Sequence, residues 1–130
     1  MSFLGIDFGT KNIGIAISDD NNQIAFPLKT VQNKDFFEFL ESLLREIKIE
    51  KIIVGLPLNL KMQKTQQTEL TLNFFKKLKK RFKGEIILEN EFYTSRQAGK
   101  ILGDYKKDMI DAVSAALILQ SYLDKIKNKS

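Results

Sequence analysis

The stretch that decides the fold is Phe3-Leu4-Gly5-Ile6-Asp7-Phe8-Gly9-Thr10-Lys11-Asn12-Ile13-Gly14-Ile15-Ala16-Ile17-Ser18-Asp19. Both arms are apolar and are punctuated by Gly9 and Gly14, so the stretch predicts a strand, a glycine turn and a second strand. Asp7 departs from this pattern, because it places a carboxylate between Ile6 and Phe8. An unpaired charge is costly to bury, so Asp7 predicts a compensating group, most simply a cation. The alternative is that Asp7 only begins the turn, as Asp before Gly often does.

The composition limits the chemistry. The 130 residues include no Cys and no His. Disulfides, zinc sites built from thiolates or imidazoles, cysteine nucleophiles and Ser-His-Asp triads are therefore excluded. Any metal must be held by oxygen ligands, which predicts one or two magnesium or manganese ions. The net charge of +5 favours an anionic partner, although it supports nucleic acid only weakly.

The length and the hydropathy pattern predict a single domain over 1–130 in the cytoplasm. A chain of this size forms one core and is too short for two. No apolar run is long enough for a membrane span, the N-terminus lacks the layout of a secretion signal, and the absence of Cys fits a cytosolic protein.

The rest of the chain alternates strands and helices. Pro27 favours an edge position for the third strand, and Asn33 is expected to cap the first helix. The expected elements are a strand over 23–28, a helix over 34–47, a strand over 51–58, a helix over 64–83, a strand over 85–89, a short helix from Thr94-Ser95-Arg96-Gln97, and a helix over 107–126.

This order predicts an α/β fold with a five-stranded mixed sheet flanked by helices. Three antiparallel strands come first, and two parallel strands follow through helical crossovers. The first strand is expected at the centre, with the hairpin on one side and the later strands on the other.

Three acids from distant parts of the sequence are expected to meet on this fold. Asp7 lies on the first strand, Glu91 follows the last strand, and Asp111 lies on the buried stripe of the final helix. Such carboxylates can bind two divalent ions that activate a water molecule and stabilise the leaving oxygen of a phosphodiester. For Asp111 the simpler interpretation is that an acid is favourable in the first turn of any helix.

A cluster of basic residues follows the apolar face of the helix over 64–83. A solvated helix surface explains any one of its lysines, whereas the cluster as a whole favours neutralisation of phosphates. Together with Lys11, the candidates for nucleic-acid binding are Lys76, Lys77, Lys80 and Arg81.

Four blocks of this sequence together resemble the YqgF (RuvX) family, nearly from end to end and in order. They are Asp7-Phe8-Gly9-Thr10-Lys11-Asn12-Ile13-Gly14-Ile15-Ala16; Ile53-Val54-Gly55-Leu56-Pro57-Leu58-Asn59; Asn90-Glu91 with Thr94-Ser95; and Asp111-Ala112-Val113-Ser114-Ala115-Ala116 with Leu119-Gln120-Ser121-Tyr122-Leu123.

The resemblance implies a ribonuclease-H-like fold and a cytoplasmic bacterial nuclease. The implied roles are trimming the 5′ end of pre-16S rRNA within pre-ribosomal particles or, by similarity to RuvC, resolving Holliday junctions. The acidic positions of the family carry over to Asp7, Glu91 and Asp111. The departures are Asn90 for an acid, Phe92 for an arginine, Lys61-Met62 for Asp-Gly, and a shortened basic loop over 103–107.

Three classes of function follow. The first is a metal-dependent nuclease of structured RNA or DNA. The second is a nucleotide-binding module, because Asp-x-Gly-Thr also opens the phosphate-binding hairpin of actin-like ATPases and sugar kinases; those need a second domain that 130 residues cannot supply. The third is a catalytically weak nucleic-acid-binding protein. The pattern does not decide whether the substrate is RNA or DNA, or whether the protein is a monomer or a homodimer.

Overall fold

The computed structural model describes residues 1–57, 65–91 and 109–128. The sequence differences at Lys61-Met62, Phe92 and 103–107, and the helix expected from Thr94, lie outside these ranges. The elements are β1 (Ser2–Asp7), β2 (Asn12–Ser18), β3 (Ala25–Gln32), the 3-10 turn η1 (Asn33–Asp35), α1 (Phe36–Glu46), β4 (Ile49–Pro57), α2 (Gln66–Arg81), β5 (Glu85–Glu91) and α4 (Ile110–Asn128).

The five strands form one sheet in the order β3-β2-β1-β4-β5. β1 pairs antiparallel with β2, and β2 pairs antiparallel with β3, whereas β4 is parallel to both β1 and β5. The expected mixed sheet with the first strand at its centre is therefore confirmed.

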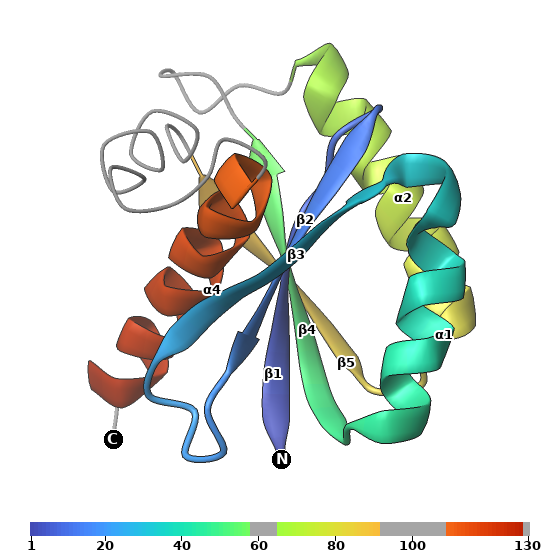
Figure 1. Cartoon of the computed structure of the whole chain (residues 1–130). Coiled ribbons are helices and arrows are strands. Elements are labelled where there is room, and N and C mark those ends of the chain that lie inside the picture. The colour runs from blue at the N-terminus through green and yellow to red at the C-terminus, as the bar shows by residue number, and fades with distance from the viewer. Residues whose placement is uncertain (58–64, 92–108, 129–130) are drawn as a thin grey trace.

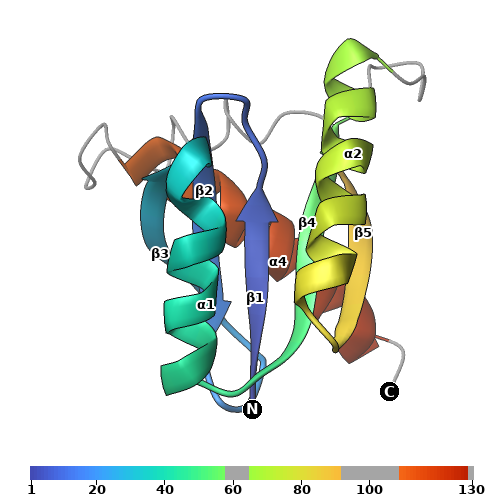
Figure 2. The ribbon, with the colours of Figure 1, turned by 90° about the vertical axis from the view of Figure 1, so that its right-hand side faces the viewer.

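Helices cover both faces of the sheet (Figure 1). α1 and α2 lie side by side on one face, and α4 crosses the other (Figure 2). The alternation along β1 explains the two cores: Leu4 and Ile6 pack toward α1 and α2, and Phe3 packs toward α4. Among the described helices, we find none whose length and apolar character would let it cross a bilayer.

Two glycines let α4 approach the sheet closely. A Cβ atom on Gly5 would lie 2.7 Å from the Cβ of Leu119, and one on Gly14 would lie 1.8 Å from the carbonyl oxygen of Asp111. A side chain at either strand position would push the helix away. Glycine within a strand often marks such an approach of another backbone.

The third strand differs from the prediction. It runs to Gln32, well beyond residue 28, although Pro27 does lie on the edge strand as expected. The β2–β3 register shifts between Ile15 and Ala16, because Ile15 pairs with Lys29 while Ala16 pairs with Pro27. This bulge lets the edge strand accommodate Pro27 and continue through the polar residues that follow it.

The prediction that Asn33 caps the first helix is wrong. Asn33 is the first residue of η1, and neither η1 nor α1 has a side-chain cap. The Asn33 amide Nδ2 instead donates to the carbonyl oxygen of Gly9 over 2.8 Å. A 3-10 turn precedes the helix and directs this side chain to the β1–β2 turn.

Candidate metal and nucleic-acid site

Asp7 ends the central strand. It is half-buried, and its backbone pairs with Gly14 on β2. Phe3 and Gly5 contact α4, and Asp7 follows Gly5 at two-residue spacing, so it belongs to the same face of the sheet. Its carboxylate is therefore presented on the α4 side, at the carboxyl end of β1.

Asp111 reaches the same corner through the backbone. The tight contact of Gly14 with the Asp111 carbonyl group seats the first turn of α4 on the strand residue that pairs with Asp7. The backbones of two acids that are more than 100 positions apart along the chain thus come close together on one face of the sheet.

Glu91 lies at the same edge of the sheet. It is the last residue of β5 and pairs with Pro57, the last residue of β4. Because β1, β4 and β5 are parallel, their carboxyl ends face the same way, near the start of α4 (Figure 1). β1 and β5 are two strands apart, which corresponds to about 10 Å across the sheet.

The structure thus places the backbones of the three acids at one edge. The described side chains contain no group of three acids that could hold a metal ion. The side chain of Glu91 lies outside the described part of the chain, so the ligand set of the three acids remains a prediction.

Burial raises the pKa of the Asp111 carboxyl group above its ordinary value. Removal from water disfavours the charged form of an acid, and a cation beside it would offset that cost. A cation bound beside Asp111 would therefore stabilise the charged form of this acid.

We expect Asp111→Asn to stabilise the metal-free protein at neutral pH. When the pKa of an acid is higher in the folded state, stability falls as the pH rises from the ordinary pKa through the raised one. The amide removes this penalty, and we expect thermal unfolding in EDTA at pH 7 to show a higher Tm than that of the wild type.

The gain should vanish well below pH 3.8, the ordinary pKa, where the carboxyl group is protonated in both states. Asp20→Asn makes the same chemical change at an exposed turn and serves as the control. A lower Tm at pH 7 for Asp111→Asn would contradict this account of the site.

The first turn of α2 is also attached to this edge. Thr65 caps the helix through a capping box with Thr68, and the Thr68 hydroxyl group donates to the carbonyl oxygen of Pro57 over 2.5 Å. The Gln67 amide donates to the carbonyl oxygen of Phe8 over 3.5 Å. The sequence interpretation missed these supporting residues, although Thr65 and Thr68 have the spacing of a capping box.

The basic residues predicted to bind nucleic acid fall in two places. Lys11 lies in the turn between β1 and β2, which begins after Asp7. Lys76, Lys77, Lys80 and Arg81 lie in the second half of α2, on the opposite face of the sheet from α4 (Figure 2). Measured from Gln67, Lys76 lies about 14 Å along the helix axis and Arg81 about 21 Å. The structure does not bring this cluster to the acids.

Arg81 has a structural role in addition. Its guanidinium group pairs with Glu41 of α1 at 3.2 Å and lies 5.1 Å from the centre of the Phe37 ring. Lys76, Lys77 and Lys80 are exposed and form no ion pair within the described residues. The three lysines are thus the freer part of the cluster.

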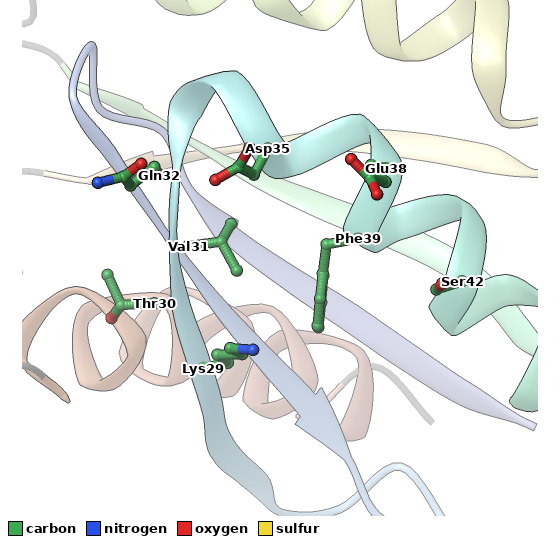
Figure 3. Close-up of a pocket in the computed structure, with 8 residues that line it drawn as sticks. All are labelled: Lys29, Thr30, Val31, Gln32, Asp35, Glu38, Phe39 and Ser42. Atoms are coloured by element: carbon green, nitrogen blue, oxygen red, sulfur yellow. The ribbon is translucent and has the colours of Figure 1, made fainter.

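A hollow of about 510 Å³ lies between β3 and α1 (Figure 3). Its lining mixes charges, with Asp35 and Glu38 from the helical side and Lys29 from the strand. It contains none of the three predicted acids. This surface is therefore separate from the candidate metal site.

Curated relatives match nearly the whole chain. A protein of Sulfurihydrogenibium sp. named "Putative pre-16S rRNA nuclease" is 41% identical, covering 95% of this chain and 90% of its own length. A protein of Thermoanaerobacter pseudethanolicus with the same name is 38% identical, and the match covers 99% of this chain and 100% of that protein's length.

Solved structures share the fold at low identity. The fowlpox virus resolvase in complex with Holliday junction DNA has a TM-score of 0.60 and 16% identity, covering 97% of this chain and 99% of its own. Thermus thermophilus RuvC with a Holliday junction substrate has a TM-score of 0.56 and 14% identity, covering 97% and 96%. These neighbours confirm the expected ribonuclease-H-like fold.

The sequence model of the family described as "RuvX: Holliday junction resolvase" matches residues 1–125. With the relatives above, this match confirms the family expected from the four sequence blocks. The chain belongs to the RuvX family.

Proposed function

We propose that this protein is a divalent-metal-dependent nuclease that hydrolyses phosphodiester bonds during 5′-end processing of pre-16S rRNA in the cytoplasm. The observation that carries the proposal is the contact of Gly14 with the Asp111 backbone, which sets Asp111 beside the strand pair that holds Asp7. The substrate follows the name of the relatives that match the chain at 38–41% identity.

The donor set fits a magnesium or manganese ion. The chain offers carboxylate oxygens and no His or Cys, and burial disfavours the charged form of Asp111 when no cation is present. We assign Asp7, Glu91 and Asp111 as the residues that hold one or two ions and thereby form the catalytic centre. When bound, such ions lower the pKa of water and stabilise charge on the leaving oxygen.

The protein's own residues orient the strand. We assign Lys11, in the turn after Asp7, to a contact with a backbone phosphate close to the cut. Gln67 and Thr68 hold the surrounding loop ends in position through their bonds to Phe8 and Pro57. These contacts fix the edge of the sheet on which a phosphodiester would lie.

The cluster of Lys76, Lys77, Lys80 and Arg81 is proposed as a second contact with the backbone of a long substrate. The distance along α2 from Gln67 to this cluster, about 14–21 Å, exceeds the Debye length of about 8 Å at physiological salt. The cluster therefore acts through its own contacts with the substrate. An unchanged affinity and salt dependence for a long RNA in a Lys76→Glu/Lys80→Glu variant would rule out this contact.

The second candidate function is resolution of Holliday junctions. The description of the family favours it, and two fold neighbours were solved with junction DNA. A resolvase must cut two strands symmetrically and would act as a homodimer, whereas an rRNA trimmer can act as a monomer.

One experiment separates these functions. The purified protein is given a pre-16S rRNA fragment with its 5′ extension and a four-way DNA junction, each with magnesium, manganese or EDTA. We expect the RNA to be cut with either metal and not in EDTA, and the junction to be cut at least about tenfold more slowly, a difference of roughly 1.4 kcal/mol in the barrier. Faster junction cleavage would establish the second function, and tight binding of both without cleavage would leave only a binding protein.

A further inference from the structure

A second hollow lies at the turn between β1 and β2, which begins after Asp7. It has a volume of about 380 Å³ and is lined by Thr10, Lys11, Gln32, Asn33 and Lys34. Thr10 and Lys11 come from the β1–β2 turn, and the other three come from the junction of β3 and η1. Two segments that are 20 residues apart therefore form one site.

Backbone contacts fix these two segments against each other. The backbone N–H of Asn33 donates to the carbonyl oxygen of Lys11 over 2.9 Å, and the Asn33 side chain donates to that of Gly9 over 2.8 Å. Asn12 and Gln32 are register partners in the sheet. The lysines on either side of the hollow thus start from a fixed backbone frame.

The lining selects for an anion. It contains two ammonium groups, a hydroxyl group and two amide groups, and no carboxylate. Within the described residues neither Lys11 nor Lys34 forms an ion pair, so both charges are available to a ligand. The hollow between β3 and α1 has Asp35 and Glu38 in its lining and lacks this selectivity.

The distance to the catalytic edge suits a nucleic-acid strand. Thr10 follows Asp7 by three residues, and three extended residues span at most about 10 Å. A strand carries one phosphate for about every 3.4 Å along the axis of a duplex. A phosphate in the hollow would therefore lie within about three nucleotides of one at Asp7.

We propose that Thr10, Lys11, Gln32, Asn33 and Lys34 form a subsite for one backbone phosphate of the substrate strand, within three nucleotides of the bond that is cut. This inference rests on the proposed nuclease function and extends it, because it fixes where the uncut part of the strand is held. Lys34, which lies outside the sequence blocks of the family, becomes a residue that contacts substrate.

The test is a scan with neutral methylphosphonate groups placed singly at positions along a non-cleavable strand, with Kd measured by fluorescence anisotropy in EDTA. In the wild-type protein we expect one position within three nucleotides of the cut to weaken binding about tenfold when it is neutralised. In a Lys11→Gln/Lys34→Gln variant the same replacement should change Kd less than about twofold. The slope of log K against log salt concentration should fall by about the contribution of one phosphate contact.

Lys48→Gln is the matched control. Lys48 is exposed, and its carbonyl oxygen accepts from the N–H of Ser2 at the opposite end of β1, so its scan should equal that of the wild type. The Tm of each variant reports whether it has folded, and the exposed positions of both pocket lysines predict an unchanged value.

The outcomes separate the subsite from the proposed function. A flat scan in the wild type, or a scan that the lysine substitutions leave unchanged, overturns the subsite even if cleavage is observed. Absence of cleavage overturns the nuclease function, while the anisotropy scan still reports on the hollow. Binding of inorganic phosphate through both lysines without any position dependence on the strand would show an adventitious ion only, and would also overturn the subsite.

Discussion

Replacing Asp7 with Asn should abolish cleavage and leave the fold intact. The amide has nearly the same shape, but it lacks the negative charge that holds a divalent ion. Loss of one carboxylate from a metal site removes stabilisation of charge in the transition state, and we expect a fall in kcat of at least about 1,000-fold, or roughly 4 kcal/mol.

The measurement is single-turnover cleavage of the RNA fragment in saturating magnesium, with affinity for the non-cleavable strand measured in parallel. Affinity should change less than about threefold, because phosphate contacts by lysines provide most of the binding. Asp20→Asn, in the exposed β2–β3 turn, is carried through the same purification and should keep full activity. If Asp7→Asn cuts at the wild-type rate, the metal assignment is wrong.

The metal content provides a readout that does not depend on turnover. Manganese binding followed by calorimetry should be detectable for the wild type and weakened at least about tenfold for Asp7→Asn. Equal manganese affinity in the two proteins would mean that the ion, if it acts, is held elsewhere.

Much of the fold could be predicted because its elements have clear periodic patterns. The apolar arms around Asp7 and the helical spacing of Phe36, Leu40 and Leu43 correspond to β1, β2 and α1. The order of elements then constrains the sheet, since two antiparallel hairpins on one side and two parallel strands on the other leave the first strand at the centre. The parts that failed depend on tertiary contacts. Asn33 has the sequence signature of a cap, but its amide group binds Gly9 across the fold.

The site could be predicted only in part. Asp7 and Asp111 could be singled out because an acid among apolar residues needs a group that compensates its charge. The strand order then places their backbones together. The position of the α2 lysines could not be read from the sequence, because the same amphipathic pattern fits a helix on either face of the sheet. The hollow around Lys11 and Lys34 was also hidden, since it depends on hydrogen bonds between segments that share no sequence pattern.

Gly14→Ala should strongly destabilise the fold. An added Cβ atom would lie 1.8 Å from the carbonyl oxygen and 2.1 Å from the carbonyl carbon of Asp111, with the Ala112 nitrogen at 2.8 Å. These are backbone atoms in the first turn of a helix, so no rotamer change can relieve the contact. The helix must move from the sheet, and we expect a loss of about 3–5 kcal/mol.

Substitutions at two further positions should give a graded series of stabilities. At Gly5 the added Cβ atom would lie 2.7 Å from the Leu119 side chain and 2.8 Å from the Ala115 carbonyl oxygen, so Gly5→Ala should destabilise less than Gly14→Ala. Asn12→Ala, at the exposed start of β2, should change stability by less than about 0.5 kcal/mol. Urea unfolding of the three variants gives the order directly.

The same substitution links stability to activity. Because Gly14 pairs with Asp7 and contacts Asp111, a helix displaced by the methyl group separates the two acids even when both are present. Gly14→Ala protein that remains folded at low temperature should therefore bind manganese more weakly and cut more slowly than Gly5→Ala protein of equal folded fraction. A Gly14→Ala variant as stable and as active as the wild type would show that α4 does not rest on β2 at this residue, and the shared corner of Asp7 and Asp111 would lose its basis.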